Sequence, residues 1–171
     1  GDKESNNSML FVNYDQIAND VKTGEKILID DGRILLKINK ILNNQVFCVI
    51  LHGGELFSNK GVNLPNTRIS LPAITNKDLE DISFCIKNKT EWLALSFVRK
   101  AKDIIQLKNI IDLKNSNCRI IAKIEKPEAI KNLHHIINIA DALMVARGDL
   151  GVEVPTQKVP VLQKKIVRAA R

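Results

Sequence analysis

The stretch DALMVARGDLGVEVP, from Asp141 to Pro155, decides the fold. It opens with an apolar run, Ala142 to Ala146, that shows no alternation with polar residues. Uninterrupted runs of this kind are typical of strands that are buried on both faces of a parallel sheet. An arginine, an aspartate and two glycines follow the run closely. A strand with this ending leads either into a plain turn or into a place where an anionic ligand is held.

Two further apolar runs, WLALSF (Trp92–Phe97) and RIIAKI (Arg119–Ile124), precede this stretch. Helical patterns of isoleucine and leucine alternate with the three runs and begin at Leu79, Ile104 and Ile130, spaced by 25 and 26 residues. The chain therefore repeats a strand–helix unit. Such repeats build either a doubly wound sheet or part of a (β/α)8 barrel. The polar residues at the strand ends favour the barrel.

The helical patterns also predict where helices begin and which side chains face the core. Thr75, with Asp78 three residues later, is a capping box for the first helix. A last helix is expected from about Pro160, because proline suits the first turn. The side chains expected to face inward are Leu79, Ile82, Ile86, Ile104, Leu107, Ile111, Ile130, Leu133, Ile137, Leu162, Ile166 and Ala169.

The first part of the chain has a different pattern. The short β segments KILID, ILLKI and QVFCVIL are separated by Asp31-Gly32 and Asn43-Asn44, which are hairpin signals. The pattern changes to a helical one near Leu71-Pro72. We therefore predict an α/β protein, with a small, mostly antiparallel β domain over residues 1–71 and strand–helix units over residues 72–171.

Each of the three predicted parallel strands ends with polar groups. Ser96 lies at the end of the first, Lys123 and Glu125 at the end of the second, and Asp149 follows the third. The carboxyl ends of parallel strands meet at one rim, where ligands bind. Lys123 and Glu125 are two residues apart, so their side chains point to the same face. Two carboxylates from neighbouring strand ends suit a hard cation such as Mg²⁺, and a lysine beside them suits a phosphate or an enolate.

A simpler interpretation exists for each motif taken alone. A Lys-x-Glu pair at a strand end is usually a surface ion pair, and Arg-Gly-Asp is usually a turn. Their occurrence at consecutive strand ends within one repeat favours a site for a metal ion and an anion. Gly148 and Gly151 are expected to let backbone N–H groups approach a ligand carboxylate.

Composition narrows the classes of function. The 171 residues carry a net charge of +7, but only 4% are aromatic, which argues against a stacking platform for nucleic acid. No apolar run reaches the roughly 18 residues of a membrane span, and the polar start does not resemble a secretory signal. Cys48, Cys85 and Cys118 stand far apart in apolar runs, which predicts buried free thiols in a reducing compartment. We therefore expect no nucleic-acid partner, no membrane partner and a protein that is not secreted.

Several stretches resemble the motifs of one enzyme family. MVARGDLGVEVP and AKIEKPEAI are similar to the two most specific motifs of pyruvate kinases. SNKGVNLPNTRISLPAITNKDLEDI resembles the segment that leaves the mobile lid domain of that family and re-enters its barrel, and LALSFVRKAKDI and ILIDDGRILLKI match as well. The resemblance extends from about Val12 to Arg171, and the chain is similar to plastid-type and bacterial members. It implies that residues 1–71 are most of a lid domain and that residues 72–171 form the middle part of a (β/α)8 barrel.

The resemblance also implies a reaction and a role for each site residue. The reaction is phosphoryl transfer from phosphoenolpyruvate to ADP, which gives pyruvate and ATP with Mg²⁺ or Mn²⁺ and, in most members, K⁺. The implied roles are catalysis by Lys123, metal binding by Glu125 and Asp149, contact with phosphoenolpyruvate by Ala146, Arg147, Gly148 and Asp149, lining of the site near the monovalent cation by Ser96, and nucleotide binding from the lid by Lys60.

The resemblance further implies that this chain is a fragment. The family's first barrel strands, with the K⁺ ligands, would precede Gly1, and a regulatory C-terminal domain would follow Arg171. We expect the chain alone to be inactive and to self-associate, and the full-length enzyme to be a homotetramer of the cytoplasm or of a plastid. Two other classes stay open, namely a metal-dependent pyruvate aldolase or lyase of similar barrel type and a non-catalytic basic binding module.

Overall fold

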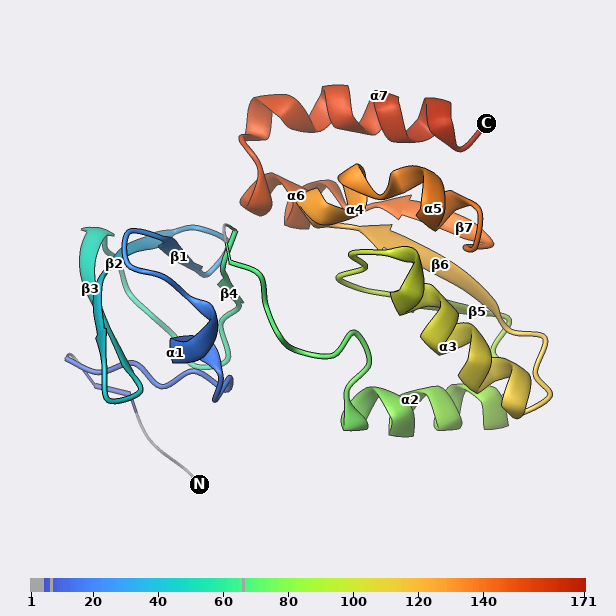
Figure 1. Cartoon of the computed structure of the whole chain (residues 1–171), viewed down its shortest axis with the longest axis horizontal. Helices are drawn as coiled ribbons and strands as arrows, with labels where there is room; N and C mark the ends of the chain where they lie inside the picture. The colour runs from blue at the N-terminus through green and yellow to red at the C-terminus, as the bar shows by residue number, and fades with distance from the viewer. Residues whose placement is uncertain (1–4, 7, 66) are drawn as a thin grey trace. The chain divides into compact units, whose positions relative to one another are not determined.

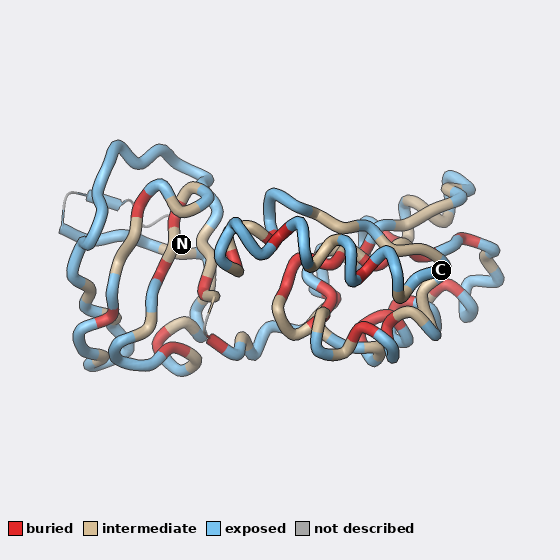
Figure 2. The backbone as a smooth tube through the Cα atoms, turned by 90° about the horizontal axis from the view of Figure 1, so that it is seen from above, coloured by how far each residue is buried: buried red, intermediate tan, exposed pale blue. Residues whose placement is uncertain are grey.

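The computed structural model describes residues 5–6, 8–65 and 67–171. The chain divides into two compact units, Gly1–Ser70 and Leu71–Arg171, and each is described by itself (Figure 1). Both units contain buried residues of their own (Figure 2).

The first unit is built on an antiparallel sheet. Within the residues that the structure describes, its four strands have the order β3-β2-β1-β4. The elements are α1 (Ile17–Asp20), β1 (Lys26–Ile29), β2 (Ile34–Leu42), β3 (Gln45–His52) and β4 (Val62–Asn63). The apolar core of this unit consists of Val21, Ile27, Ile29, Ile34, Ile38 and Leu64.

The tight turns of this sheet lie where the sequence predicts them. Asp30 and Asp31 have φ angles of 52° and 56°, and Asn43 and Asn44 have φ angles of 49° and 61°. Consecutive residues with positive φ match the twist of a two-stranded hairpin, and Asp and Asn tolerate this conformation better than most side chains. The antiparallel hairpins are therefore confirmed. The sequence does not predict β4, a two-residue strand that pairs with β1.

The second unit is a parallel sheet with helices between its strands (Figure 1). Its three strands have the order β5-β6-β7, and both pairings are parallel. The strands are β5 (Trp92–Leu95), β6 (Arg119–Ile124) and β7 (Ala142–Val145). The helices are α2 (Asn76–Lys87), α3 (Ala101–Leu113), α4 (Pro127–Lys131), α5 (Leu133–Ile137), α6 (Arg147–Glu153) and α7 (Val159–Ala169), with a 3-10 turn, η1, at Thr156–Lys158. The predicted α/β class, with an antiparallel part followed by a parallel part, is confirmed.

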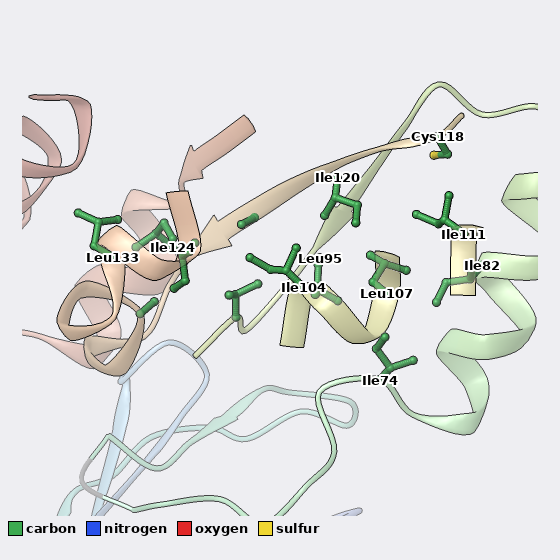
Figure 3. Packing of buried hydrophobic residues seen from close by; sticks show 14 of the residues in the cluster. Ile74, Ile82, Leu95, Ile104, Leu107, Ile111, Cys118, Ile120, Ile124 and Leu133 are labelled. Carbon is green, nitrogen blue, oxygen red and sulfur yellow. The ribbon is translucent and has the colours of Figure 1, made fainter. Parts of the chain in front are cut away.

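Helix α3 packs against the sheet through the face that its sequence pattern predicts. Ile104, Leu107 and Ile111 are almost completely buried in one apolar cluster with Ile120 of β6 and Leu95 of β5 (Figure 3). Full burial of a side chain of this size stabilises the fold by about 1.5–3 kcal/mol. This face therefore fixes α3 against β5 and β6.

Two of the predicted helices differ in detail. The capping box of Thr75 and Asp78 is present at the start of α2, but Leu79 is 41% exposed, so its predicted inward position is wrong. Helix α2 packs on the core one turn later, through Ile82. The single helix expected over residues 130–137 is divided into α4 and α5 at Asn132, whose side chain donates a hydrogen bond to the backbone carbonyl of Arg99 at 2.9 Å.

The three cysteines are free thiols, as the sequence predicts. Cys118 is buried, and burial raises the pKa of its thiol. Cys48 and Cys85 are only half-buried, so the prediction that all three are buried is wrong for these two. Each lies on an element with one face turned to solvent, β3 and α2 respectively.

Candidate active site

The centre of the candidate site is an ion pair at the end of β6. Lys123 Nζ lies 2.6 Å from Glu125 Oε1. The side chain of Glu125 is 1% exposed and that of Lys123 is 24% exposed. The alternation of β6 explains the arrangement, because Ala122 and Ile124, which alternate with the pair along the chain, point into the core. The prediction that the two side chains share one face is confirmed.

The end of β5 contributes two further contacts to this pair. The Ser96 hydroxyl accepts a hydrogen bond from Lys123 Nζ at 2.9 Å. The backbone N–H of Phe97 donates to Glu125 Oε2 at 2.8 Å. Phe97 has a φ of 53°, which is an uncommon and strained backbone conformation for a bulky residue. The strained turn aims an N–H group at the carboxylate, and the sequence pattern gave no sign of it.

The second carboxylate oxygen of Glu125, Oε1, is the one relevant to metal binding. Glu125 Oε1 is buried and, among the described residues, has the Lys123 ion pair but no hydrogen bond of good geometry. A buried carboxylate oxygen in this state has acceptor capacity left for a cation. No group of three or more His, Cys, Asp or Glu side chains gathers within the described ranges. Mg²⁺ is typically bound through one or two protein carboxylates, with substrate and water oxygens as its other ligands, and the Glu125 carboxylate is one group that could hold it.

The stretch Asp141–Pro155 contains a helix where the sequence predicts a strand end or a turn. Residues Arg147–Glu153 are α6, which begins directly after β7 with Ala146 at its N-cap position. Two glycines lower the intrinsic helix propensity of this segment. Leu150, which is completely buried and donates its N–H to the Ala146 carbonyl at 2.9 Å, holds the helix in place. The sequence pattern alone does not reveal that Leu150 is buried.

The predicted site residues of α6 lie on the exposed part of the helix. Arg147, Gly148 and Asp149 are exposed, and Ala146 is half-buried. Neither Gly148 nor Gly151 has a left-handed backbone, and the missing side chain of Gly148 faces open space. The first-turn N–H groups of a helix have no partner within the helix, and the open space beside Gly148 leaves this backbone accessible to a ligand.

A second ion pair, which the sequence does not predict, lies beside the site. Lys126 Nζ donates to Glu153 Oε1 at 2.5 Å, with side-chain exposures of 10% and 2%. Lys126 Nζ also lies 5.8 Å from the centre of the Phe97 ring. The two partners are 27 residues apart, at the start of α4 and the end of α6. The signal in the sequence is a lysine directly after Glu125, next to the proline that begins α4.

Lys60, the predicted nucleotide-binding residue, belongs to the first unit. Its Nζ lies 3.0 Å from Asp30 Oδ1, in the turn between β1 and β2. The hydrogen bond from Lys60 lowers the pKa of the Asp30 carboxyl. The backbone N–H of Asp30 also donates to the carbonyl of Gly61 at 3.0 Å, so the hairpin holds the segment around Lys60 by two contacts.

The parallel strands carry a lysine, a buried glutamate and a serine at their carboxyl ends, which makes this an α/β protein with polar groups gathered at the rim where proteins of this class bind ligands. The sequence comparisons identify its family. The family model described as "Pyruvate kinase, barrel domain" matches residues 2–171, and the chain belongs to the pyruvate kinase family.

Individual relatives agree with the family match. The chain is 46% identical over 159 residues to pyruvate kinases of Staphylococcus aureus strains MRSA252, USA300 and NCTC 8325. The aligned region covers 92% of this chain and 27% of each relative, so the chain spans about a quarter of their length. Within the described part of the chain, no helix is long and apolar enough to cross a membrane.

Proposed function

We propose that this chain supplies part of the active site of an enzyme that transfers a phosphoryl group from phosphoenolpyruvate to ADP and forms pyruvate and ATP. One observation carries the proposal. In a chain of the pyruvate kinase family, Lys123, Glu125 and Ser96 converge at the carboxyl ends of neighbouring parallel strands. Phosphoryl transfer needs mainly positioning and charge neutralisation, and these residues provide groups for both.

Lys123 is the catalytic residue of the proposal. Its ammonium group stabilises negative charge that develops on the transferring phosphoryl group and on the enolate left behind. Ser96 and Glu125 hold the ammonium group in place from two sides, at 2.9 and 2.6 Å. Ala146, Arg147, Gly148 and Asp149 lie along the bound phosphoenolpyruvate, with the Gly148 and Asp149 N–H groups directed at its carboxylate.

Glu125 and Asp149 are the residues that would hold Mg²⁺ or Mn²⁺. When bound, the metal ion neutralises charge on the substrate oxygens. The acceptor capacity of Glu125 Oε1 and the exposure of Asp149 support this assignment. Ser96 lines the site near a monovalent cation, K⁺ in most members of the family.

We also propose how the complete enzyme is built. The three parallel strands and their helices are part of a (β/α)8 barrel, and the antiparallel unit is a lid that brings Lys60 to the phosphates of ADP. The complete enzyme is a homotetramer. The strand–helix order of the second unit and the match to a barrel-domain family support the barrel.

The proposal is tested with the complete enzyme. This is the chain joined to the remaining pyruvate kinase segments, either in its natural reading frame or in a chimera with the S. aureus enzyme. We expect pyruvate from phosphoenolpyruvate and ADP, measured in a coupled assay with Mg²⁺. Turnover of a 2-keto acid with an aldehyde, without use of ADP, would instead indicate an aldolase or lyase. A steep salt dependence of oligonucleotide binding without turnover would indicate a basic binding module.

A further inference from the structure

The position of α6 depends on contacts outside the helix. Seven residues are too few for a helix to be stable in isolation. Leu150 and Glu153 are its buried residues. Because the exposed Asp149 directly precedes Leu150 in the same short helix, whatever fixes Leu150 and Glu153 also fixes Asp149.

Lys126 forms a buried ion pair with Glu153, and its position directly after Glu125 connects this pair to the site. It directly follows Glu125 in extended backbone, with φ −111° and ψ 145°. Successive side chains in extended backbone point in opposite directions. Lys126 therefore points away from the Lys123–Glu125 pair, and it acts on the site through Glu153 and through the Phe97 ring.

Helix geometry connects Glu153 to Asp149. Residues four apart in a helix lie on the same face, one turn from each other. Two carboxylates in this relation repel each other, and the buried Lys126 ammonium compensates the charge of Glu153. A continuous connection thus runs from Glu125 to the adjacent Lys126, across the ion pair to Glu153, and back one turn to Asp149. In Figure 1, α4 (orange) and α6 (red) lie side by side, as this contact requires.

We propose that Lys126 and Glu153 are positioning residues that set the separation between the two metal-binding carboxylates, Glu125 and Asp149. The inference rests on the proposed function, because it concerns the metal site assigned there. Neither residue touches substrate or metal. Their ion pair keeps the short helix α6 in register with the end of β6, so that one cation is shared by carboxylates from two elements.

The test measures Mn²⁺ affinity of the complete enzyme by electron paramagnetic resonance, without substrates and well below the unfolding temperature. We expect Lys126→Met and Glu153→Gln each to weaken Mn²⁺ binding by about tenfold, which is the lower range for residues that orient metal ligands. Lys126→Arg keeps the charge and should restore most of the affinity. Lys131→Met, at an exposed lysine of α4, is the matched control and should bind Mn²⁺ normally.

A second readout separates positioning from simple stabilisation. Lys126→Met should lower kcat and leave the Michaelis constant for ADP unchanged, because the nucleotide site is not altered. A purely structural ion pair would lower the unfolding temperature and leave both the Mn²⁺ affinity and kcat of the folded enzyme intact, and that result would overturn the inference. If Lys126→Met does not fold, Glu153→Gln and Lys126→Arg decide by the same measurements whether the ion pair positions the metal ligands or only stabilises the fold.

Glu125→Gln in the same titration distinguishes the two levels of the proposal. If Glu125→Gln loses Mn²⁺ binding while Lys126→Met and Glu153→Gln bind normally, the positioning role is wrong and the metal site stands. If Glu125→Gln also binds Mn²⁺ normally, the metal site is wrong and the positioning role fails with it.

Discussion

Replacing Lys123 by methionine is the most direct test of the proposed mechanism. The change keeps the length of the side chain and removes an ammonium group that contacts Glu125 Oε1 at 2.6 Å and the Ser96 hydroxyl at 2.9 Å. Because that charge acts mainly on the transition state, we expect kcat to fall by about a hundredfold or more, which corresponds to about 2.7 kcal/mol. The Michaelis constant for phosphoenolpyruvate should change little.

The same substitution has a cost in stability that must be separated from its effect on catalysis. Among the described residues, it leaves the Glu125 carboxylate, 1% exposed, with a hydrogen bond from the Phe97 N–H. Loss of one partner from a fully buried pair costs about 3–5 kcal/mol. Lys123 is 24% exposed, so water already solvates part of its charge. We therefore expect a smaller loss, of about 1–3 kcal/mol.

The assay is steady-state pyruvate formation by the complete enzyme, together with its thermal unfolding. The double variant Lys123→Met, Glu125→Gln removes the uncompensated charge and should recover stability without recovering turnover. Lys108→Met, at an exposed position of α3, should behave like the unmodified enzyme in both measurements. A variant Lys123→Met with nearly normal kcat and a strongly raised Michaelis constant would refute the reasoning, because Lys123 would then bind the ground state.

Four further predictions follow from the structure. Glu125→Gln or Asp149→Asn should weaken Mn²⁺ binding and turnover of the complete enzyme, and unchanged Mn²⁺ affinity in both variants would contradict the metal assignment. Lys60→Ala should raise the Michaelis constant for ADP more than that for phosphoenolpyruvate, whereas equal effects would argue against a nucleotide role. Cys118 should resist alkylation in the folded protein at pH 8, because burial shields the thiol and raises its pKa, so that less thiolate is present than at an exposed cysteine. Labelling in native buffer is followed by mass spectrometry, and rapid labelling would contradict the burial of Cys118. Residues 1–171 alone should lack pyruvate kinase activity and should scatter light as aggregates or oligomers, and an active monomer would contradict this expectation.

Local signals explain which parts of the fold the sequence predicts. Asn43-Asn44 and the Asp30–Gly32 turn specify hairpins because few other residues tolerate positive φ in succession. The Ile104–Ile111 stripe specifies the buried face of α3 because the spacing alone places these side chains together. The Lys123–Glu125 contact was predictable for the same reason, since strand alternation sets it within three residues.

The parts that the sequence does not predict depend on contacts between distant residues. Helix α6 contains two glycines and forms because Leu150 and Glu153 are buried against other elements. Phe97 takes a strained backbone conformation that nothing in its neighbours indicates. Asn132 divides a helical pattern because its side chain bonds to Arg99, 33 residues earlier. In each case tertiary contacts override the local propensity of the segment.

The central position of β6 explains why the polar groups of the site depend on one another. Its register pairs Ala122 with Leu95 of β5 and Lys123 with Met144 of β7. A slip of one residue would exchange the two faces of the strand, so that Ile124 would replace the Lys123–Glu125 pair at the rim. The apolar residues that alternate with the pair oppose such a slip, because they would leave the core at the same time. The burial of Ile120, Ala122 and Ile124 is therefore also what orients the charges, and the chemistry proposed for this rim is a consequence of how the strand is packed.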